Sequence, residues 1–491
     1  MNPKLFSAVK QERDIREYVL PVSAGVIALL GIFTNYYIPC ALALPVITVL
    51  MIIDRLGKGI ILRELTALHA SFTCLVMPVL GYTYYTRDNF LSRQWVRWMP
   101  VPKEVYFRVA VPALAAYTMA LCWPIVAEKY GDYGLRLREI LERSKIQLKE
   151  NPRLGIIIMA VGAVAQAISR YLPSALGFVI TLVYWSAFAG VLYLYYTPNF
   201  KQRMLILFGF ALFIVGLAIQ NGMFTIVAYM GITLFSFFFI GNKFSVWKKL
   251  VLFLVACSLM LVLQAAKGRY RALLWHGGGE LDNKAAVFGS IFADQVGNFS
   301  TFFSEDAFFP FYYRTNQGYN VSLVMMTIPA RKPFDNGANL GTGFASAFVP
   351  RALWPDKPEA GGKFNMLYYT GIHLRGWSTN VGPLGEAYGS FGADGGMIYM
   401  FFLGLFIRWA YRYMFKVSQK MPLIIFWIPV VFYEVTYSAE TDSMQIFNSI
   451  IKAAFFLYVL WKLKPGWLYI TKKINRRALG AKRQEASTAN T

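Results

Sequence analysis

Long apolar runs recur along this chain, and they constrain its fold more than any other feature. A helix needs about 20 mostly apolar residues to cross the hydrocarbon core of a bilayer. Charged residues make up only 15% of the chain, against about 25% in soluble domains. We therefore expect an all-α polytopic membrane protein with about twelve transmembrane helices, at residues 18–35, 37–53, 65–84, 106–126, 154–171, 175–196, 204–220, 223–241, 250–266, 396–414, 422–438 and 446–463.

Basic residues cluster in alternate segments between these runs, as Lys248 with Lys249 and Lys472 with Lys473 illustrate. Because cytoplasmic loops collect Lys and Arg, the pattern predicts that both termini lie on the inner side, with residues 85–105 as an exception. The formal net charge of +23 is spread over these loops. A nucleic-acid partner would require one contiguous basic face, so we expect none.

The long hydrophilic segments divide the chain into four parts. We expect residues 1–266 to hold the first nine transmembrane helices, 267–394 to form a large periplasmic cap, 395–463 to hold the last three helices, and 464–491 to be a basic cytoplasmic tail. Within the first part, residues 127–153 combine regularly spaced leucines and isoleucines with many basic residues. This pattern predicts an amphipathic helix on the anionic inner leaflet.

The segment 267–394 is too long to be a simple connection, and its many aromatic residues argue against disorder. Apolar residues recur at helical spacing from Val287 to Phe303, and Asn283 stands where it would cap that helix. The remainder, 304–394, is expected to form a folded, loop-rich cap.

A group of cations follows the ninth apolar run. Lys267, Arg269 and Arg271 lie within five residues of one another, and further cations follow at Arg314, Arg331, Lys332, Arg351, Lys357, Lys363 and Arg375. Arginine binds phosphate oxygens through two parallel hydrogen bonds, so cations at headgroup depth suit a lipid diphosphate. The alternative is that they are solvated or contact lipid headgroups.

Three prolines stiffen the stretch FVPRALWPDKP, residues 348–358. Proline fixes its own φ angle and restricts the residue before it, which predicts an extended, rigid strip that aims Arg351, Asp356 and Lys357. A structural loop with a surface ion pair is the alternative.

The glycine-rich stretch at residues 385–396, GEAYGSFGADGG, carries our preferred catalytic base, Glu386. Glycines permit close approach of a ligand to the backbone, and a carboxylate there could activate a sugar hydroxyl. Asp356, His373 and Asp394 are the other candidates, and a purely structural linker is the alternative.

Ionisable residues also occur within or beside the apolar runs, namely Arg170, Glu434, Glu440 and Asp442. An ionisable group in a transmembrane segment is functional or pairs with an opposite charge. For the three acidic residues, salt bridges to the arginine cluster are the simpler reading.

The sequence carries no familiar motif for metal or nucleotide binding. The four cysteines all fall in apolar runs, and the sequence contains neither a GxxxxGK[ST] nor an HExxH motif. We predict no metal site and no cofactor. A substrate on the outer side would therefore have to arrive already activated.

Three features together resemble the Wzy-type oligosaccharide repeat-unit (O-antigen) polymerases. They are the many apolar runs, one large outer loop late in the chain, and PRALWPDKP at residues 350–358 followed by GEAYGSFG at 385–392. Arg351 and Gly362 also fit an arginine–glycine spacing described for loops of some members. The motifs span residues 350–392, whereas the topology covers the whole chain.

The resemblance implies a metal-independent glycosyltransferase of the bacterial inner membrane with its active face in the periplasm. Such an enzyme moves a growing glycan from undecaprenyl diphosphate onto a new lipid-linked repeat unit of O-antigen or exopolysaccharide. Its partners would be undecaprenyl-diphosphate-linked glycans and membrane lipids, with a chain-length regulator and a flippase in the same assembly route. The diphosphate would be bound by Lys267, Arg269, Arg271, Arg314, Lys357 and Arg375. The catalytic residues would be Glu386, Arg351, Asp356 and His373.

Three rival functions remain at this stage. An O-antigen ligase-type enzyme would share the fold class but use a different acceptor. A polysaccharide flippase or exporter would carry polar residues along several helices of matching halves, and we find no internal repeat. A non-enzymatic scaffold of an envelope assembly is the third.

Overall fold

The computed structural model describes residues 16–125, 133–171, 177–222, 224–242, 244–276, 283–349, 353–358, 361–375 and 378–469. Every regular element in these ranges is a helix, and they contain no strand. The all-α prediction is therefore confirmed for the described part of the chain.

Nine helical segments within those ranges are long and apolar enough to cross a membrane, so the chain is an integral membrane protein. The count rises to ten if α7 (Tyr133–Glu150) and α8 (Leu154–Ile168), which meet at a bend of 86°, form one broken span. The nine are α1 (Arg16–Phe33), α2 (Tyr37–Arg55), α3 (Leu62–Ser71) joined to α4 (Met77–Thr83), α6 (Lys103–Cys122), α9 (Gly177–Tyr196), α10 (Arg203–Asn221), α12 (Val246–His276), α18 (Gly382–Ser418) and α21 (Ser443–Leu463).

The expected twelve spans were too many, because three apolar runs do not form full-length helices of their own. The run at 154–171 forms α8, which has 15 residues and passes as a span only together with α7. The run at 223–241 forms α11 (Thr225–Phe238), whose 14 residues reach only about 21 Å, short of a hydrocarbon core of about 30 Å. The run at 422–438 is broken into a 3₁₀ segment (Pro422–Trp427), α19 (Ile428–Val431) and α20 (Tyr433–Thr436). Its residues from 422 to 433 are buried in the protein, so their apolar character reflects core packing and not contact with lipid.

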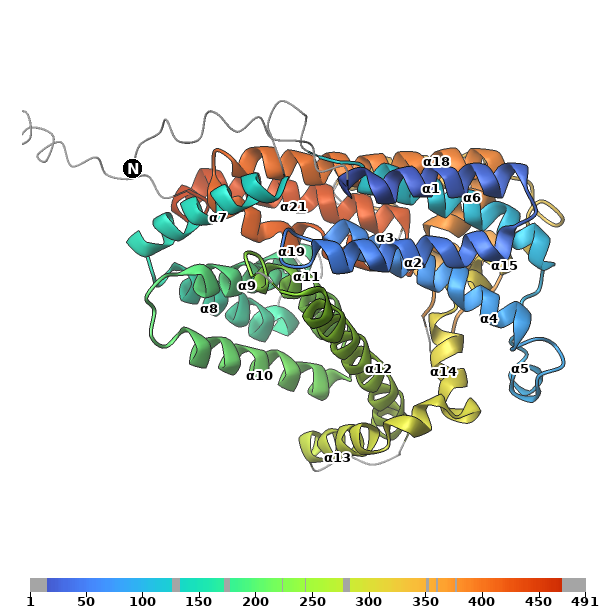
Figure 1. Ribbon diagram of the computed structural model, residues 1–491, viewed down its shortest axis with the longest axis horizontal. Coiled ribbons are helices and arrows are strands. Elements are labelled where there is room, and N and C mark those ends of the chain that lie inside the picture. The colour runs from blue at the N-terminus through green and yellow to red at the C-terminus, as the bar shows by residue number, and fades with distance from the viewer. Residues whose placement is uncertain are drawn as a thin grey trace, which may run out of the picture.

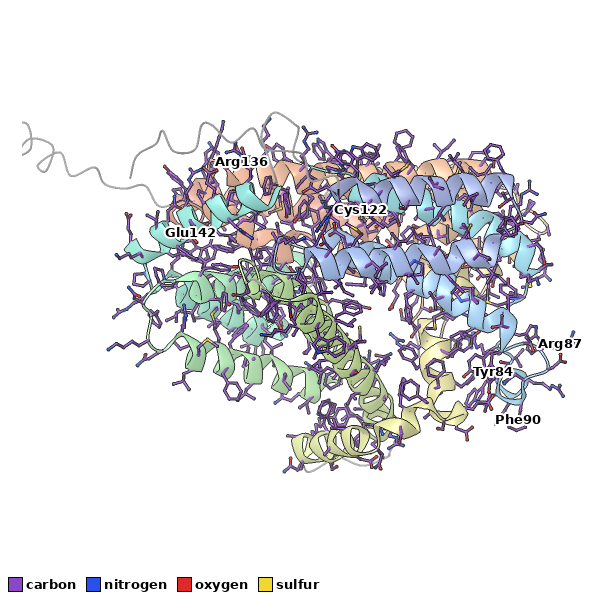
Figure 2. The ribbon with its side chains drawn as sticks, in the orientation of Figure 1. Tyr84, Arg87, Phe90, Cys122, Arg136 and Glu142 are labelled. Atoms are coloured by element: carbon purple, nitrogen blue, oxygen red, sulfur yellow. The ribbon has the colours of Figure 1, made fainter. Side chains whose placement is uncertain are left out.

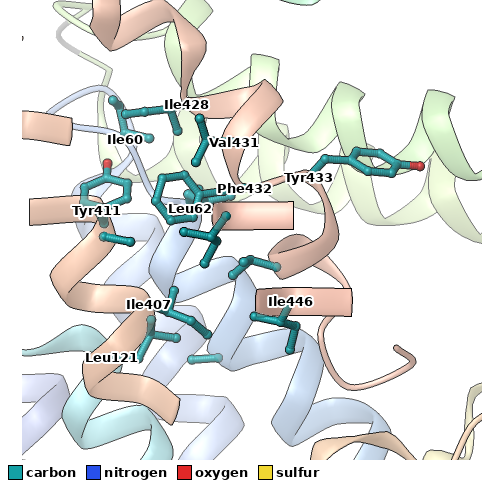
Figure 3. Packing of buried hydrophobic residues seen from close by; sticks show 14 of the residues in the cluster. Ile60, Leu62, Leu121, Ile407, Tyr411, Ile428, Val431, Phe432, Tyr433 and Ile446 are labelled. Atoms are coloured by element: carbon teal, nitrogen blue, oxygen red, sulfur yellow. The ribbon is translucent and has the colours of Figure 1, made fainter. Parts of the chain in front are cut away.

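Most of the long helices pack side by side around one core, whereas α12 packs in a smaller cluster with the end of α10. In Figure 1, α1, α6 and α18 run along one edge of the molecule, α8, α9 and α10 form a second group, and α12 crosses obliquely to reach α13 (Lys284–Gly297). Figure 3 shows side chains from several of these helices meeting in the core, among them Leu62, Leu121, Ile407, Phe432 and Ile446. This core includes the broken segment that precedes α21.

The helix α18 is longer than the predicted run at 396–414, because it already begins at Gly382. The glycine-rich stretch is therefore the first part of a helix and not a linker. Glycine is needed there for close packing, since a Cβ on Gly389 would lie 2.5 Å from the ring of Tyr369. Gly392, with φ 72° and ψ −158°, kinks the helix, and the arm before the kink carries Glu386.

The amphipathic helix predicted within 127–153 is present as α7. Its apolar face, which includes Leu137, Ile140 and Leu141, is buried and contacts α9 and the 3₁₀ segment at 422–427. The structure thus uses this face for packing within the protein, where the sequence had suggested the lipid surface. Figure 2 shows Arg136 and Glu142 of α7 at the opposite end of the molecule from Tyr84, Arg87 and Phe90.

The segment predicted as an outer cap is largely helical. After α13 come a 3₁₀ turn (Phe299–Phe303), α14 (Glu305–Thr315), α15 (Gln317–Thr327), α16 (Ala338–Phe348) and α17 (Gly362–Thr370), and α14 and α15 lie at the same end of the molecule as α5 (Phe90–Gln94) (Figure 1). The Asn283 cap is confirmed, because its Oδ1 accepts a hydrogen bond of 2.9 Å from the backbone N–H of Ala286. The residues from Lys267 to His276 continue α12.

Candidate functional site

The site is organised around a short turn between α20 and α21, at residues 437–442. The turn carries two carboxylates, Glu440 and Asp442, which take different hydrogen-bond partners. Asp442 caps α21 through a bond of 2.6 Å from the N–H of Gln445 to its Oδ1. We call the group formed by Asp442 and Glu386 the carboxylate side. The group formed by Glu440, Lys267, Arg271 and Arg314 is called the cation side.

On the carboxylate side, Asp442 lies near Glu386 from the first part of α18. Both are almost completely buried, with 0% and 2% of their surface exposed. Glu386 Oε1 accepts a hydrogen bond of 2.9 Å from Asn365 Nδ2, and Oε2 accepts one of 2.8 Å from the N–H of Ser443. Asn380 Nδ2 donates to Asp442 Oδ2 over 3.1 Å. Buried carboxylates need such donors, and all four oxygens have one.

A network of amides holds these donors in place. The backbone carbonyl of Asn380 accepts hydrogen bonds from Gln317 Nε2 (2.6 Å) and Asn320 Nδ2 (3.0 Å), both on α15. Asn320 also donates to Thr379 Oγ1 over 2.8 Å. The loop before α18 lies so close to α17 that a Cβ on Gly362 would be 1.6 Å from the carbonyl oxygen of Thr379. Side-chain networks of this kind fix a site when every member is satisfied.

Glu386 and Asp442 line a common pocket. The other lining residues are amide-bearing or apolar: Asn339, Leu340, Gly343, Pro358, Phe364, Asn365 and Met444. The amides and carboxylates of this lining can form hydrogen bonds with the hydroxyl groups of a polar ligand.

The two carboxylates influence one another's ionisation. The charge of Asp442 acts on Glu386, and burial raises the pKa of Asp442 although the N–H of Gln445 and the Asn380 amide oppose the change. Two acidic groups in one buried site do not readily ionise together, so they tend to share a proton. Such a pair can accept a proton from a bound hydroxyl.

On the cation side, Glu440 Oε1 lies 3.1 Å from His69 Nε2 and accepts a hydrogen bond of 3.4 Å from the hydroxyl of Tyr229. His69 comes from α3 and Tyr229 from α11, and their rings meet edge to face with centroids 5.8 Å apart. Tyr229 also stacks on Tyr437 at 4.6 Å. The carboxylate is therefore held by residues from two helices remote from it in sequence.

Two cations lie near this carboxylate, Lys267 from α12 and Arg314 from α14, and Arg271 of α12 lies near both of them. Lys267 is only 8% exposed, and within the described ranges its ammonium makes no hydrogen bond or ion pair. The charges of Arg271 and Arg314 both act on it, and Arg271 Nε donates to the carbonyl of Gly222 over 2.6 Å. A buried cation without a bonded anion is costly, so Lys267, with Arg314 near it, is a candidate for binding an anionic group.

The ionisation of Glu440 reflects this setting. Burial acts to raise the pKa of its carboxyl, but the hydrogen bond and charge of His69, with the charges of Arg314 and Lys267, outweigh burial and lower the pKa. Glu440 is therefore a fixed negative charge beside the cations. Because an ionised carboxylate only accepts hydrogen bonds, His69 Nε2 must be the donor.

The structure brings together some of the residues predicted for the site. Glu386 lies in the pocket, and Lys267, Arg271 and Arg314 lie on the cation side. Arg269 points elsewhere, since it is exposed and pairs with Asp294 of α13 at 2.8 Å.

The other predicted residues that the structure describes lie outside both sides of the site. Lys357 is buried and donates to the backbone carbonyls of Ser346 and Val349, which ties its loop to α16. Asp356, His373 and Arg375 are exposed and are not among the described residues that line the pocket. Arg351 lies outside the described residues.

The proline-rich stretch is not the extended strip that its sequence suggested. The N–H of Lys357 donates to the carbonyl of Trp354 over 3.2 Å, so residues 354–357 form a β-turn. Proline favours the second position of such a turn as well as extended backbone, and Pro355 occupies that position. Pro358 then lines the pocket.

Sequence reasoning missed His69, Asn365, Asn380 and Tyr229. His69 was detectable in principle, since it is an ionisable side chain in an apolar run. The two asparagines had no such signal, because their importance comes from contacts with residues far away in the chain.

Comparison with known proteins gives one match. A family model described as a domain of unknown function (DUF8712) matches residues 133–415. This range includes Glu386, Lys267 and Arg314, whereas His69, Glu440 and Asp442 lie outside it. No curated protein and no solved structure matches the chain.

Proposed function

The chain belongs to the family of proteins with this domain of unknown function (DUF8712), and from that premise we propose that it is a membrane glycosyltransferase acting on lipid-diphosphate-linked saccharides. Its specific reaction is the polymerisation of undecaprenyl-diphosphate-linked repeat units at the periplasmic face of a bacterial inner membrane. The product is an O-antigen or exopolysaccharide chain.

One observation carries the proposal: the carboxylate side and the cation side meet at a single turn. Asp442 belongs to a pocket lined by amides and carboxylates, which can hydrogen-bond sugar hydroxyls, and Glu440, two residues earlier, lies beside cations that can bind a phosphate group. A lipid-linked diphosphate sugar presents these two chemical groups next to one another.

The residues on the two sides divide the chemistry of transfer between them. The acceptor hydroxyl oxygen attacks the anomeric carbon of the donor sugar, and its proton passes to the Glu386–Asp442 pair. The bond from the anomeric carbon to the phosphate oxygen breaks, and its electron pair stays on the diphosphate. Lys267, Arg271 and Arg314 stabilise the charge that develops on this leaving group, and preorganised charges of this kind are a major source of catalysis.

The sequence supports the choice of polymerase among such transferases. The helix-rich topology and the residues 350–358 and 385–392 resemble the Wzy-type polymerases, and two residues within these motifs, Pro358 and Glu386, line the pocket.

Reconstitution tests the enzymatic proposal directly. Purified protein in liposomes, supplied with a lipid-diphosphate-linked oligosaccharide, should yield a ladder of longer lipid-linked products with release of lipid diphosphate. A chelator should leave the yield unchanged, because the proposed step uses no metal. Absence of any ladder while the folded protein is present would contradict the proposal.

Deletion of the gene separates the polymerase from its rivals. A surface glycan ladder that collapses to a single repeat unit supports polymerisation. Loss of all attached glycan, with lipid-linked polymer accumulating, would instead indicate a ligase. Unpolymerised units that accumulate on the inner face would indicate a flippase.

A further inference from the structure

The position of Glu440 poses a question for any anion site built from Lys267, Arg271 and Arg314. A carboxylate beside such cations would normally pair with them. Within the described residues, however, Glu440 makes no ion pair with Lys267 or Arg314; its hydrogen bonds go to His69 and Tyr229. Lys267 and Arg314 therefore remain available to another anion, and the negative charge of Glu440 lies beside them.

The local structure holds Glu440 in this position. His69 is the third-last residue of α3, directly before a π-helical turn (Phe72–Val76), and its carbonyl accepts a hydrogen bond of 2.8 Å from Thr73 Oγ1. Turns of this type frequently occur at functional sites. Tyr229 is fixed by its stacking on Tyr437, so the two groups that hold the carboxylate are themselves held.

A fixed negative charge affects the substrate and the product of the proposed reaction differently. The diphosphate of a lipid-linked sugar is a diester, and transfer converts its outer phosphate into a monoester, which carries nearly one more negative charge at neutral pH. Three cations alone would bind the more highly charged product more tightly than the substrate and would retain it. A nearby carboxylate repels the product more than the substrate.

We propose that Glu440, held by His69 and Tyr229 beside the three cations, weakens the binding of the diphosphate product and thereby speeds its release. The inference rests on the proposed function, since it concerns the same site, but it assigns Glu440 a role in turnover and none in bond breaking. Lys267, Arg271 and Arg314 bind the leaving group, and Glu440 limits how tightly they keep it.

Calorimetric titration with inorganic diphosphate tests this role in the full-length protein in nanodiscs. Glu440→Gln removes the charge but keeps a hydrogen-bond acceptor for His69 and Tyr229, and we expect it to bind diphosphate about tenfold more tightly, as expected for loss of one nearby like charge. Glu440→Asp keeps the charge and should bind like the wild type. In turnover assays Glu440→Gln should lower both KM and kcat and strengthen inhibition by the product.

The outcomes separate this inference from the function on which it rests. If the wild type binds diphosphate, Lys267→Met loses the binding and Glu440→Gln leaves it unchanged or weaker, the role of Glu440 is wrong and the anion site stands. If no form of the protein binds diphosphate, the proposed function fails as well.

A measurement on the wild type keeps the inference testable if Glu440→Gln does not fold. The affinities for farnesyl diphosphate, a monoester, and for its hexose diester are compared under the same conditions. We expect the two affinities to be similar or the diester to bind more tightly. A clear preference for the monoester, as cations alone would produce, would overturn the inference.

Discussion

The two sides of the turn at residues 437–442 are built in different ways. On the carboxylate side, each oxygen of Glu386 and Asp442 has a hydrogen-bond donor, and the donors are themselves held by amides of α15. On the cation side, Lys267 is buried without a bonded partner in the described ranges, and Glu440 is bonded away from it. The first arrangement holds the carboxylates in a fixed orientation, as a catalytic group requires. The second leaves Lys267 available to a negative charge on the ligand.

Glu386→Gln should have the largest effect, because it removes a member of the proton-accepting pair. We expect transfer to fall by about 10²–10⁴-fold, the usual contribution of general base catalysis, with little change in diphosphate binding. The assay is ladder formation in liposomes. Asp394→Asn is the matched control, since Asp394 is exposed on the same helix; equal losses in both variants would remove Glu386 from the mechanism.

Lys267→Met should lower transfer by about 10²-fold, a typical loss for one group that stabilises a developing charge. The same change removes a buried cation that has no bonded anion, so the thermal midpoint without ligand should rise. Activity and stability are thus expected to move in opposite directions. Arg269→Gln, two residues away on an exposed ion pair, should change activity little, because such pairs contribute at most about 1 kcal/mol.

Gly362→Ala tests the close contact between α17 and the loop that carries Asn380. The added Cβ would collide with the carbonyl of Thr379, so we expect a loss of about 1–3 kcal/mol in the free energy of unfolding, as for other overpacked sites, with reduced transfer. Gly341→Ala is the control on the neighbouring helix α16, where nothing lies within 4 Å of a new Cβ. It should be neutral or stabilising, and an equal loss there would argue against the contact.

Asn380→Ala should have the smallest effect and should appear in the pH profile. The pair must be ionised to accept a proton, and burial already raises the pKa of Asp442, so activity is lost as the pH falls through this raised pKa. Removing the Asn380 donor destabilises the ionised form, and a bond of about 1 kcal/mol corresponds to an upward shift of the acidic limb by roughly 0.7 pH units. Ser378→Ala, at an exposed position in the same loop, should leave the limb in place.

Local features of the fold were predictable from the sequence, and long-range ones were not. The Asn283 cap depends on residues three positions apart and was found, and the long apolar runs gave most of the spans. The run at 422–438 was wrongly predicted as a transmembrane helix, because a segment buried in protein is as apolar as one buried in lipid. The proline-rich stretch 350–358 was predicted to be extended, yet residues 354–357 form a turn. Proline is compatible with both conformations.

The same division applies to the site. Glu386 was recognisable as a lone carboxylate among glycines, and Lys267 as a cation at the end of an apolar run. Their functional partners are far away in the chain: Asp442 is 56 residues beyond Glu386, and His69 is 371 residues from Glu440. Only the packing of α3, α12, α14 and α18 around one turn brings them together.

The most direct test of the account is the equilibrium binding of inorganic diphosphate to the wild type, Glu386→Gln and Lys267→Met, measured alongside their transfer rates. If the two sides divide binding and chemistry as argued, Glu386→Gln binds diphosphate like the wild type but does not transfer, and Lys267→Met binds at least about tenfold more weakly, as for the loss of one close charge. Equal loss of binding in both variants, or normal transfer by either, would contradict it.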